Sequence, residues 1–267
     1  MRLPSKSASC VLASFLLGLA ALAADPGEQA ILGLWKAQMA TPEAHAALAA
    51  AGRQAEESLA GAPLANVARS LTAWHMLKAG QTNQAEAVLL RMLTPGDDAV
   101  ARAAGDMGRR WLTRLDREKV RAVLRVYYRE QVQYPADLGA LAKLPEGLRP
   151  PMKDRWDAPW RYHLTGFRHI SGLFDQKYQL ESATLGERSD LGAMLAAPYP
   201  ITMPIKPVKV EEAGGRRSVQ FAEEGQAGTI VLTEGTAAKG LTLVWAGGLA
   251  LVLSDGDYWF VVPRPSP

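Results

Sequence analysis

The sequence predicts a multidomain α+β protein with three folded regions. Residues 28 to 115 carry apolar side chains at helical spacing and show no strand-like alternation, which predicts helical hairpins. Residues 116 to 196 combine a helix with two alternating segments, which predict a small antiparallel sheet. Residues 208 to 267 contain short alternating runs between glycine-rich turns, typical of a small all-β domain. With 267 residues, 48% of them hydrophobic, the chain can bury two or three cores.

Residues 1–23 have the pattern of a signal peptide. Arg2 and Lys6 precede an apolar run from Val11 to Ala23, and Ala21-Leu22-Ala23 fits the small-x-small cleavage pattern. We therefore expect an exported, periplasmic protein; without cleavage, the same segment would tether it to the inner membrane. Cleavage would remove Cys10, the only cysteine, and two basic residues, which lowers the formal net charge from +3 to +1. A charge this small gives no reason to expect a nucleic-acid partner.

The N-terminal helical region contains one recognisable hairpin. Thr41-Pro42-Glu43 predicts a helix start, because a hydroxyl cap, a proline and an acid follow in that order. The run from Leu71 to Leu93 has Gly80 at a turn and Ala85 at a close helix crossing. It resembles a single tetratricopeptide-type hairpin.

Six arginines recur every three or four residues in the next helical segment, so on one continuous helix they share a face. They are Arg110, Arg114, Arg117, Arg121, Arg125 and Arg129. One interpretation is a stripe that binds an anionic partner or surface. The other is a solvated face, since Asp116, Glu118 and Glu130 are interleaved with the arginines. Under both interpretations, the row of arginines is divided into two parts if Asp116 caps a second helix.

Pro135 predicts that this helix ends near Gln133, because proline forces the residue before it out of helical geometry. Trp160–Leu164 and Lys177–Ser182 then alternate as strands, and Thr165-Gly166 predicts a turn after the first of them. Two strands packed against one helix make a minimal α+β layer. The helix positions expected to face the sheet are Val120, Val123, Leu124 and Tyr127.

Nine residues of the central region form a pattern of their own: Tyr134, Pro135, Asp154, Trp156, Pro159, Tyr162, Tyr178, Leu180 and Ser182. The pattern resembles the globular half of the major pseudopilin of type II secretion systems. In that family a helix ends in Tyr-Pro, an Asp-Pro-Trp-Gly-x-Pro-x-x-Tyr segment follows, and a Tyr-x-Leu-x-Ser strand comes next. The resemblance covers about a quarter of the chain, from Lys119 to about Asp190.

The resemblance implies a helix and a small antiparallel sheet. Asp154 is expected to cap its own turn, Trp156 to fill the space beneath the sheet, and Pro159 to set the entry of the next strand. Asp157 stands where the family has glycine. About a hundred residues of helical sequence precede the region, in place of the family's long hydrophobic helix, and Ala183–Asp190 offers few oxygen ligands where the family binds calcium. We therefore expect neither a filament subunit nor a calcium site.

The C-terminal part begins with a proline-rich linker, residues 197–207, which predicts an extended path. Five short runs are then predicted as strands: Ser218–Phe221, Thr229–Thr233, Leu241–Trp245, Leu249–Leu253 and Tyr258–Val262. The residues Ser254-Asp255-Gly256-Asp257 predict a hairpin connection between the last two, with Gly256 at positive φ.

No hydrolase, phosphate-binding or dinucleotide-binding motif occurs in the sequence. His163 and His169 beside Asp175 are too few ligands for a metal, and Ser182 near His163 lacks a third group to orient a base. We predict a non-enzymatic protein with no cofactor, metal or small-molecule substrate. The resemblance implies a component or accessory of a type II secretion or pilus-like assembly, whose partners are other secretion-system or envelope proteins. The other hypothesis is an unrelated periplasmic adaptor whose helical region binds a peptide or protein.

Overall fold

The computed structural model describes residues 25–266, except residues 95, 171–172, 224 and 226–227. The predicted signal peptide therefore lies outside the described residues. In this part of the chain, seven α-helices and three small antiparallel sheets form a mixed α+β structure, as the sequence predicts. Among these helices, none has the length and apolar character needed to cross a membrane.

The first four helices form an N-terminal array. They are α1 (Pro26–Ala40), α2 (His45–Ser58), α3 (Ala65–Lys78) and α4 (Thr82–Arg91). α3 and α4 form a helical hairpin whose turn residue, Gly80, has φ +75°, so the predicted turn is confirmed. The predicted helix start at Thr41 is wrong. Its hydroxyl donates to the carbonyl of Ala37 at the end of α1, and α2 begins only at His45.

The long helix α5 (Ala99–Gln131) is continuous across residues 115 and 116, the predicted domain boundary. Its 33 residues span about 50 Å. Asp98 caps its start by accepting the backbone N–H of Ala101 at 2.8 Å. Asp116 starts no second helix; it is buried in mid-helix, and Arg155 donates to it at 2.6 Å. The helix ends where Val132 takes a left-handed φ of +57°, close to the end that Pro135 predicts.

The central unit follows α5 and contains a two-stranded sheet. Its elements are α6 (Gly139–Ala142), the 3₁₀ turn η1 (Glu146–Leu148), β1 (Trp160–Ile170), β2 (Leu173–Ser182), the 3₁₀ turn η2 (Glu187–Ser189) and α7 (Leu191–Ala196). The predicted turn at Thr165-Gly166 is wrong, since β1 runs through it and stays paired with β2. The register shifts between Leu164 and Gly166, whose φ is +99°, so these residues form a bulge. Glycine at positive φ serves a turn and a bulge equally well.

The C-terminal part forms two sheets, with strand orders β3-β4-β5 and β6-β7-β8-β9. The strands are β3 (Ile205–Ala213), β4 (Arg216–Glu223), β5 (Thr229–Thr233), β6 (Ala237–Ala238), β7 (Leu241–Ala246), β8 (Ala250–Ser254) and β9 (Trp259–Pro263). All five predicted strands are confirmed. The linker prediction is wrong in part, because β3 begins inside it and Tyr199 is buried. The Tyr199 hydroxyl accepts the backbone N–H of Trp259 at 2.8 Å.

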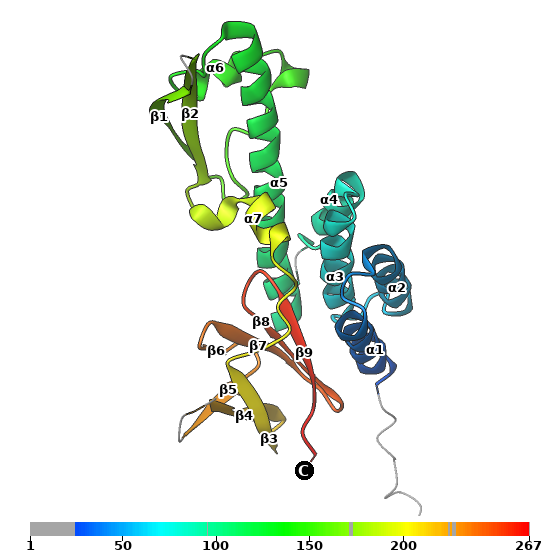
Figure 1. Ribbon diagram of the computed structural model, residues 1–267. Coiled ribbons are helices and arrows are strands. Elements are labelled where there is room, and N and C mark those ends of the chain that lie inside the picture. The colour runs from blue at the N-terminus through cyan, green and yellow to red at the C-terminus, as the bar shows by residue number, and fades with distance from the viewer. Residues whose placement is uncertain (1–24, 95, 171–172, 224, 226–227, 267) are drawn as a thin grey trace, which may run out of the picture.

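Two hydrophobic cores organise the described part of the chain. The larger one joins α1–α4 and the first half of α5 to the C-terminal strands, with Ile31, Leu71 and Trp259 among its buried members. Glu28 of α1 reinforces this junction by accepting the backbone N–H groups of Gly248 and Ala250 at 3.1 and 2.9 Å. The helical and β-rich segments, predicted as separate domains, therefore share buried surface. Figure 1 shows α5 rising from this base and carrying β1, β2 and α6 at its far end.

Candidate functional site

The tyrosines of the pseudopilin-like pattern meet between the end of α5 and the sheet. The rings of Tyr134 and Tyr178 lie 4.6 Å apart, and those of Tyr162 and Tyr178 lie 5.8 Å apart. The Tyr162 hydroxyl donates to the carbonyl of Pro135 at 2.8 Å. Burial raises the pKa of Tyr162, so its hydroxyl keeps the proton that this bond requires. The turn after α5 is thereby attached to β1, across 27 residues of sequence.

Asp154 attaches the loop before β1 to the end of β2. One carboxylate oxygen accepts the backbone N–H groups of Trp156 and Ala158 at 3.0 and 3.1 Å, which confirms the predicted cap. The other accepts the hydroxyls of Ser182 and Thr184 at 2.7 and 2.9 Å, contacts that no local sequence pattern predicts. Burial alone would raise the pKa of Asp154, but these four hydrogen bonds outweigh it and lower the pKa.

Trp156 does not fill the space beneath the sheet, contrary to expectation. It is half-buried and lies outside the central core. Trp160 takes that place: it is 6% exposed, packs in this core with Leu124 and Leu180, and donates its indole N–H to the carbonyl of Pro151 at 2.9 Å. As the first residue of β1, Trp160 shares the inward face with Tyr162, whereas Trp156 still belongs to the turn.

The turn between Asp154 and β1 otherwise has the expected form. Asp157, where the family has glycine, takes a left-handed φ of +64°. Pro159 is exposed and directly precedes β1, where it forms an isolated bridge with Lys153. Proline with its fixed φ suits this entry position. The turn therefore delivers the chain to the sheet through backbone geometry and the Asp154 carboxylate.

The six arginines of α5 occupy three different environments. Arg110 pairs with Asp106 at 2.7 Å, and Arg114 is fully buried. Arg117 and Arg121 are partly buried in ion pairs described below, while Arg125 and Arg129 are exposed. Neither a uniform binding stripe nor a uniform solvated face describes this row. The tertiary structure covers the first half of α5 with other elements and leaves the second half open on one side.

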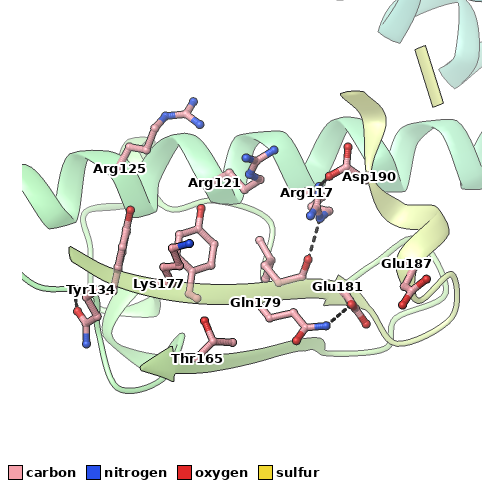
Figure 2. Close-up of a pocket in the computed structure, with 13 residues that line it drawn as sticks. Arg117, Arg121, Arg125, Tyr134, Thr165, Lys177, Gln179, Glu181, Glu187 and Asp190 are labelled. Carbon is pink, nitrogen blue, oxygen red and sulfur yellow. Dashed lines mark hydrogen bonds and ion pairs between the residues drawn. The ribbon is translucent and has the colours of Figure 1, made fainter. Parts of the chain in front are cut away.

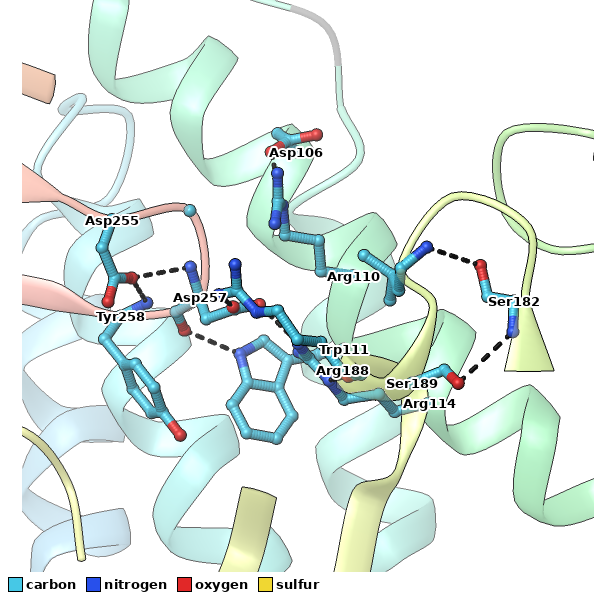
Figure 3. Close-up of polar contacts among 12 residues, drawn as sticks. Asp106, Arg110, Trp111, Arg114, Ser182, Arg188, Ser189, Asp255, Asp257 and Tyr258 are labelled. Carbon is cyan, nitrogen blue, oxygen red and sulfur yellow. Dashed lines mark hydrogen bonds and ion pairs between the residues drawn. The ribbon is translucent and has the colours of Figure 1, made fainter. Parts of the chain in front are cut away.

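Arg114 holds the middle of α5 to the base of the molecule (Figure 3). Its guanidinium pairs with Asp257, in the turn between β8 and β9, at 2.6 Å, and donates to the carbonyl of Arg188 at 2.7 Å. Arg188 also pairs with Asp257, and the Trp111 indole donates to the Asp257 carbonyl at 2.9 Å. Desolvation lowers the pKa of Arg114 to about 10, so the guanidinium stays charged at neutral pH. The sequence pattern predicts Asp257 only as a turn residue.

A groove of about 570 Å³ lies between the open half of α5 and β2 (Figure 2). Arg117, Arg121 and Arg125 line its helix side, and Tyr134, Lys177 and Tyr178 line the side of the sheet. Glu187 and Asp190 close one end, where Asp190 pairs with Arg117 at 3.0 Å. At the other end Arg125 projects from α5 and Lys177 lies on β2, and the acids labelled in Figure 2 all lie toward the opposite end. The groove therefore presents cations, aromatic rings and a strand edge together.

The described residues contain no group of three His, Cys, Asp or Glu side chains arranged to hold a metal. Ser182, the candidate nucleophile beside His163, is fully buried and donates its hydroxyl proton to Asp154, so it is not accessible as a nucleophile. His163 lies on β1, and His169 lies further along the same strand. Two other histidines, His45 and His75, are in contact, with their Nδ1 atoms 3.1 Å apart.

We expect Asp154→Asn to lower the free energy of unfolding by about 1–3 kcal/mol, because the buried hydroxyl of Ser182 and the hydroxyl of Thr184 lose a charged acceptor. Urea denaturation followed by circular dichroism measures this loss. Lys153→Ala is the matched control, since its exposed side chain pairs with the exposed Asp157, and it should change stability by less than about 0.5 kcal/mol. Equal effects of the two substitutions would contradict the role given to Asp154.

No protein-family description, curated protein or solved structure matches the chain.

Proposed function

We propose that the protein is a non-catalytic exported component or accessory of a type II secretion or pilus-like assembly, and that it acts through protein–protein contacts in the envelope. The observation that carries the proposal is the contact of pattern residues with one another. The Tyr162 hydroxyl donates to the Pro135 carbonyl, and the Ser182 hydroxyl donates to Asp154, so these bonds join residues 27 and 28 positions apart. If the sequence resemblance were accidental, there would be no reason to expect Tyr162 to contact Pro135 or Asp154 to contact Ser182.

The position of this unit also supports a contact role. It sits at the far end of α5, away from the shared core of the helices and C-terminal strands. Its sheet has two strands in the described part of the chain, so each strand has one edge without a neighbouring strand. Such edges are templates for pairing with another chain. The long helix thereby presents a binding element to partners without disturbing the base.

The adaptor hypothesis has its own supporting observation. A cavity of about 320 Å³ lies between α1 and α2. Its lining is uncharged and mostly small: Ala30, Gly33, Leu34, Ala37, Ala51, Gln54, Ala55 and Ser58. A partner helix with small residues would fit such a surface. This second function places binding on the helical array instead of the central unit.

Binding of the mature protein to purified soluble domains of a major pseudopilin and of inner-membrane secretion subunits tests the first proposal. We expect at least one complex in the micromolar range by isothermal titration calorimetry. His163→Glu, on the exposed face of β1, should weaken that complex, whereas Arg53→Glu, exposed on α2, should not. Weakening by Arg53→Glu alone would favour the adaptor, and no binding at high micromolar concentration to any subunit would refute a secretion role.

A further inference from the structure

We infer that the groove between α5 and β2 binds an extended acidic segment of a partner protein, which adds to the free edge of β2 as a third strand. The inference states what kind of segment the proposed function's partner would contribute. It rests on the proposed function only for the statement that the partner is an envelope protein. It follows from two independent features of the groove, namely the strand edge and the distribution of charge.

The first feature is the direction of the β2 backbone. The Leu180 carbonyl accepts from Arg117 on α5 at 2.8 Å, and the Ser182 N–H donates to the Ser189 hydroxyl at 3.3 Å. Both groups therefore point away from β1. In an antiparallel strand, residues two positions apart direct their backbone N–H and C=O groups to the same side. Tyr178 and Gln176 consequently present theirs on this edge, beside the groove they line.

Arg117 and Ser189 already occupy the edge near Leu180 and Ser182, so strand addition is confined to the part near Gln176 and Tyr178. In the described part of the chain, β1 is the only strand paired with β2. The groove volume of about 570 Å³ falls within the range of roughly 300–1,000 Å³ that ligand sites commonly have. It has room for a short segment, and such a segment would continue beyond the groove on both sides.

The second feature is charge. Arg121 pairs with Glu118 at 2.9 Å, and Arg117 with Asp190 at 3.0 Å. Among the described residues, neither Arg125 nor Lys177 has an acidic partner within ion-pair distance, and both are exposed. They flank the same end of the groove as Tyr134 (Figure 2). An entering strand points successive side chains to opposite faces, so acids on its helix face would meet Arg125 and acids on its outer face would meet Lys177.

A labelled peptide of about ten residues that alternates Glu and Thr tests the inference, a length typical of a strand with flanking residues. Fluorescence polarisation with the mature protein should show saturable binding, and the matched Lys-Thr peptide should not bind. Replacing every Thr by Pro keeps the charge and removes half of the N–H donors, which should weaken binding at least about tenfold. Equal affinity of the Glu-Thr and Glu-Pro peptides would overturn strand addition.

Protein variants assign the site. The double substitution Arg125→Glu with Lys177→Glu should abolish binding of the Glu-Thr peptide, because it reverses the charge at both positions. The charge-matched control is Arg53→Glu with Arg109→Glu, two exposed residues outside the groove, and it should leave the affinity within about twofold. Equal losses in both double variants would overturn the site, since they would show an unspecific charge effect.

Two further outcomes are informative. Vesicles containing phosphatidylglycerol, titrated in the same assay, should not displace the peptide; displacement through Arg125 and Lys177 would reassign the groove to a membrane surface and overturn the inference. Peptide binding together with failure of every secretion subunit to bind would uphold the groove and refute the proposed function. If a secretion subunit binds the Arg125→Glu, Lys177→Glu variant as well as the wild type, the proposed function is upheld and the groove is refuted as the binding site.

Discussion

Asp257→Ala is expected to lower the free energy of unfolding by about 3–5 kcal/mol, because it leaves the buried guanidinium of Arg114 without its counter-charge. Neither side chain is exposed to solvent, so water cannot replace the lost carboxylate. The same substitution removes the partner of Arg188. Three elements, α5, η2 and the turn between β8 and β9, would lose their common polar contact. Urea denaturation of the purified protein measures the loss.

Asp106→Ala is the control for this experiment. It removes the Arg110 ion pair on the same helix, in which both side chains are partly exposed, and such pairs contribute about 0.3–0.5 kcal/mol. The double variant Arg114→Met with Asp257→Leu should recover much of the loss, since apolar replacements avoid an unpaired buried charge. A loss below about 1 kcal/mol for Asp257→Ala would show that Arg114 does not depend on this carboxylate.

The second large effect concerns pH. Burial, and next the neighbouring His45 and Lys78, lower the pKa of His75 from 6.5 to about 4. The folded protein therefore keeps His75 neutral in a range where the unfolded chain binds a proton. Stability is fully retained above pH 6.5 and is lost as the pH falls from 6.5 to about 4. The difference in pKa corresponds to about 3 kcal/mol.

His75→Gln isolates this effect, because glutamine keeps hydrogen-bonding groups near Gln38 but does not titrate. The free energy of unfolding, measured by urea denaturation at intervals between pH 4 and 7, should fall more steeply in the wild type than in the variant. His45, which contacts both His75 and Glu43, is present in both proteins. Parallel pH curves would contradict a buried neutral His75. When His75 of α3 is protonated at low pH, we expect α3 to lose packing against α1 and α2.

Local rules were sufficient where a short stretch of chain decides its own conformation. Pro135 predicted the end of α5 within two residues, since its ring acts on the residue before it. Asp154 caps its own turn, which needs only a side chain and two following N–H groups. Gly80 and Gly256 take the positive φ that their turns require. Each of these predictions depends on atoms a few bonds apart.

The candidate groove was predictable only in part. Helical spacing placed the arginines on one helix, but it could not say which of them other elements would cover. Arg114 is buried because Asp257, 143 residues later, lies against it, whereas Arg125 is exposed because nothing in the described chain packs there. The prediction that Trp156, and not Trp160, fills the space beneath the sheet was wrong for a similar reason. Both are large apolar residues, and only the start of β1 decides which one faces the core.

By itself, the sequence determined the α+β class, the five C-terminal strands, the end of the long helix and the capped turn at Asp154. These follow from backbone geometry and alternation, which act over a few residues. Only the tertiary structure decided that the N-terminal helices share a core with the C-terminal strands, that α5 is unbroken, and that a basic groove lies beside the free edge of β2. Burial and ion pairing between distant segments depend on which surfaces meet, and no local pattern encodes that choice.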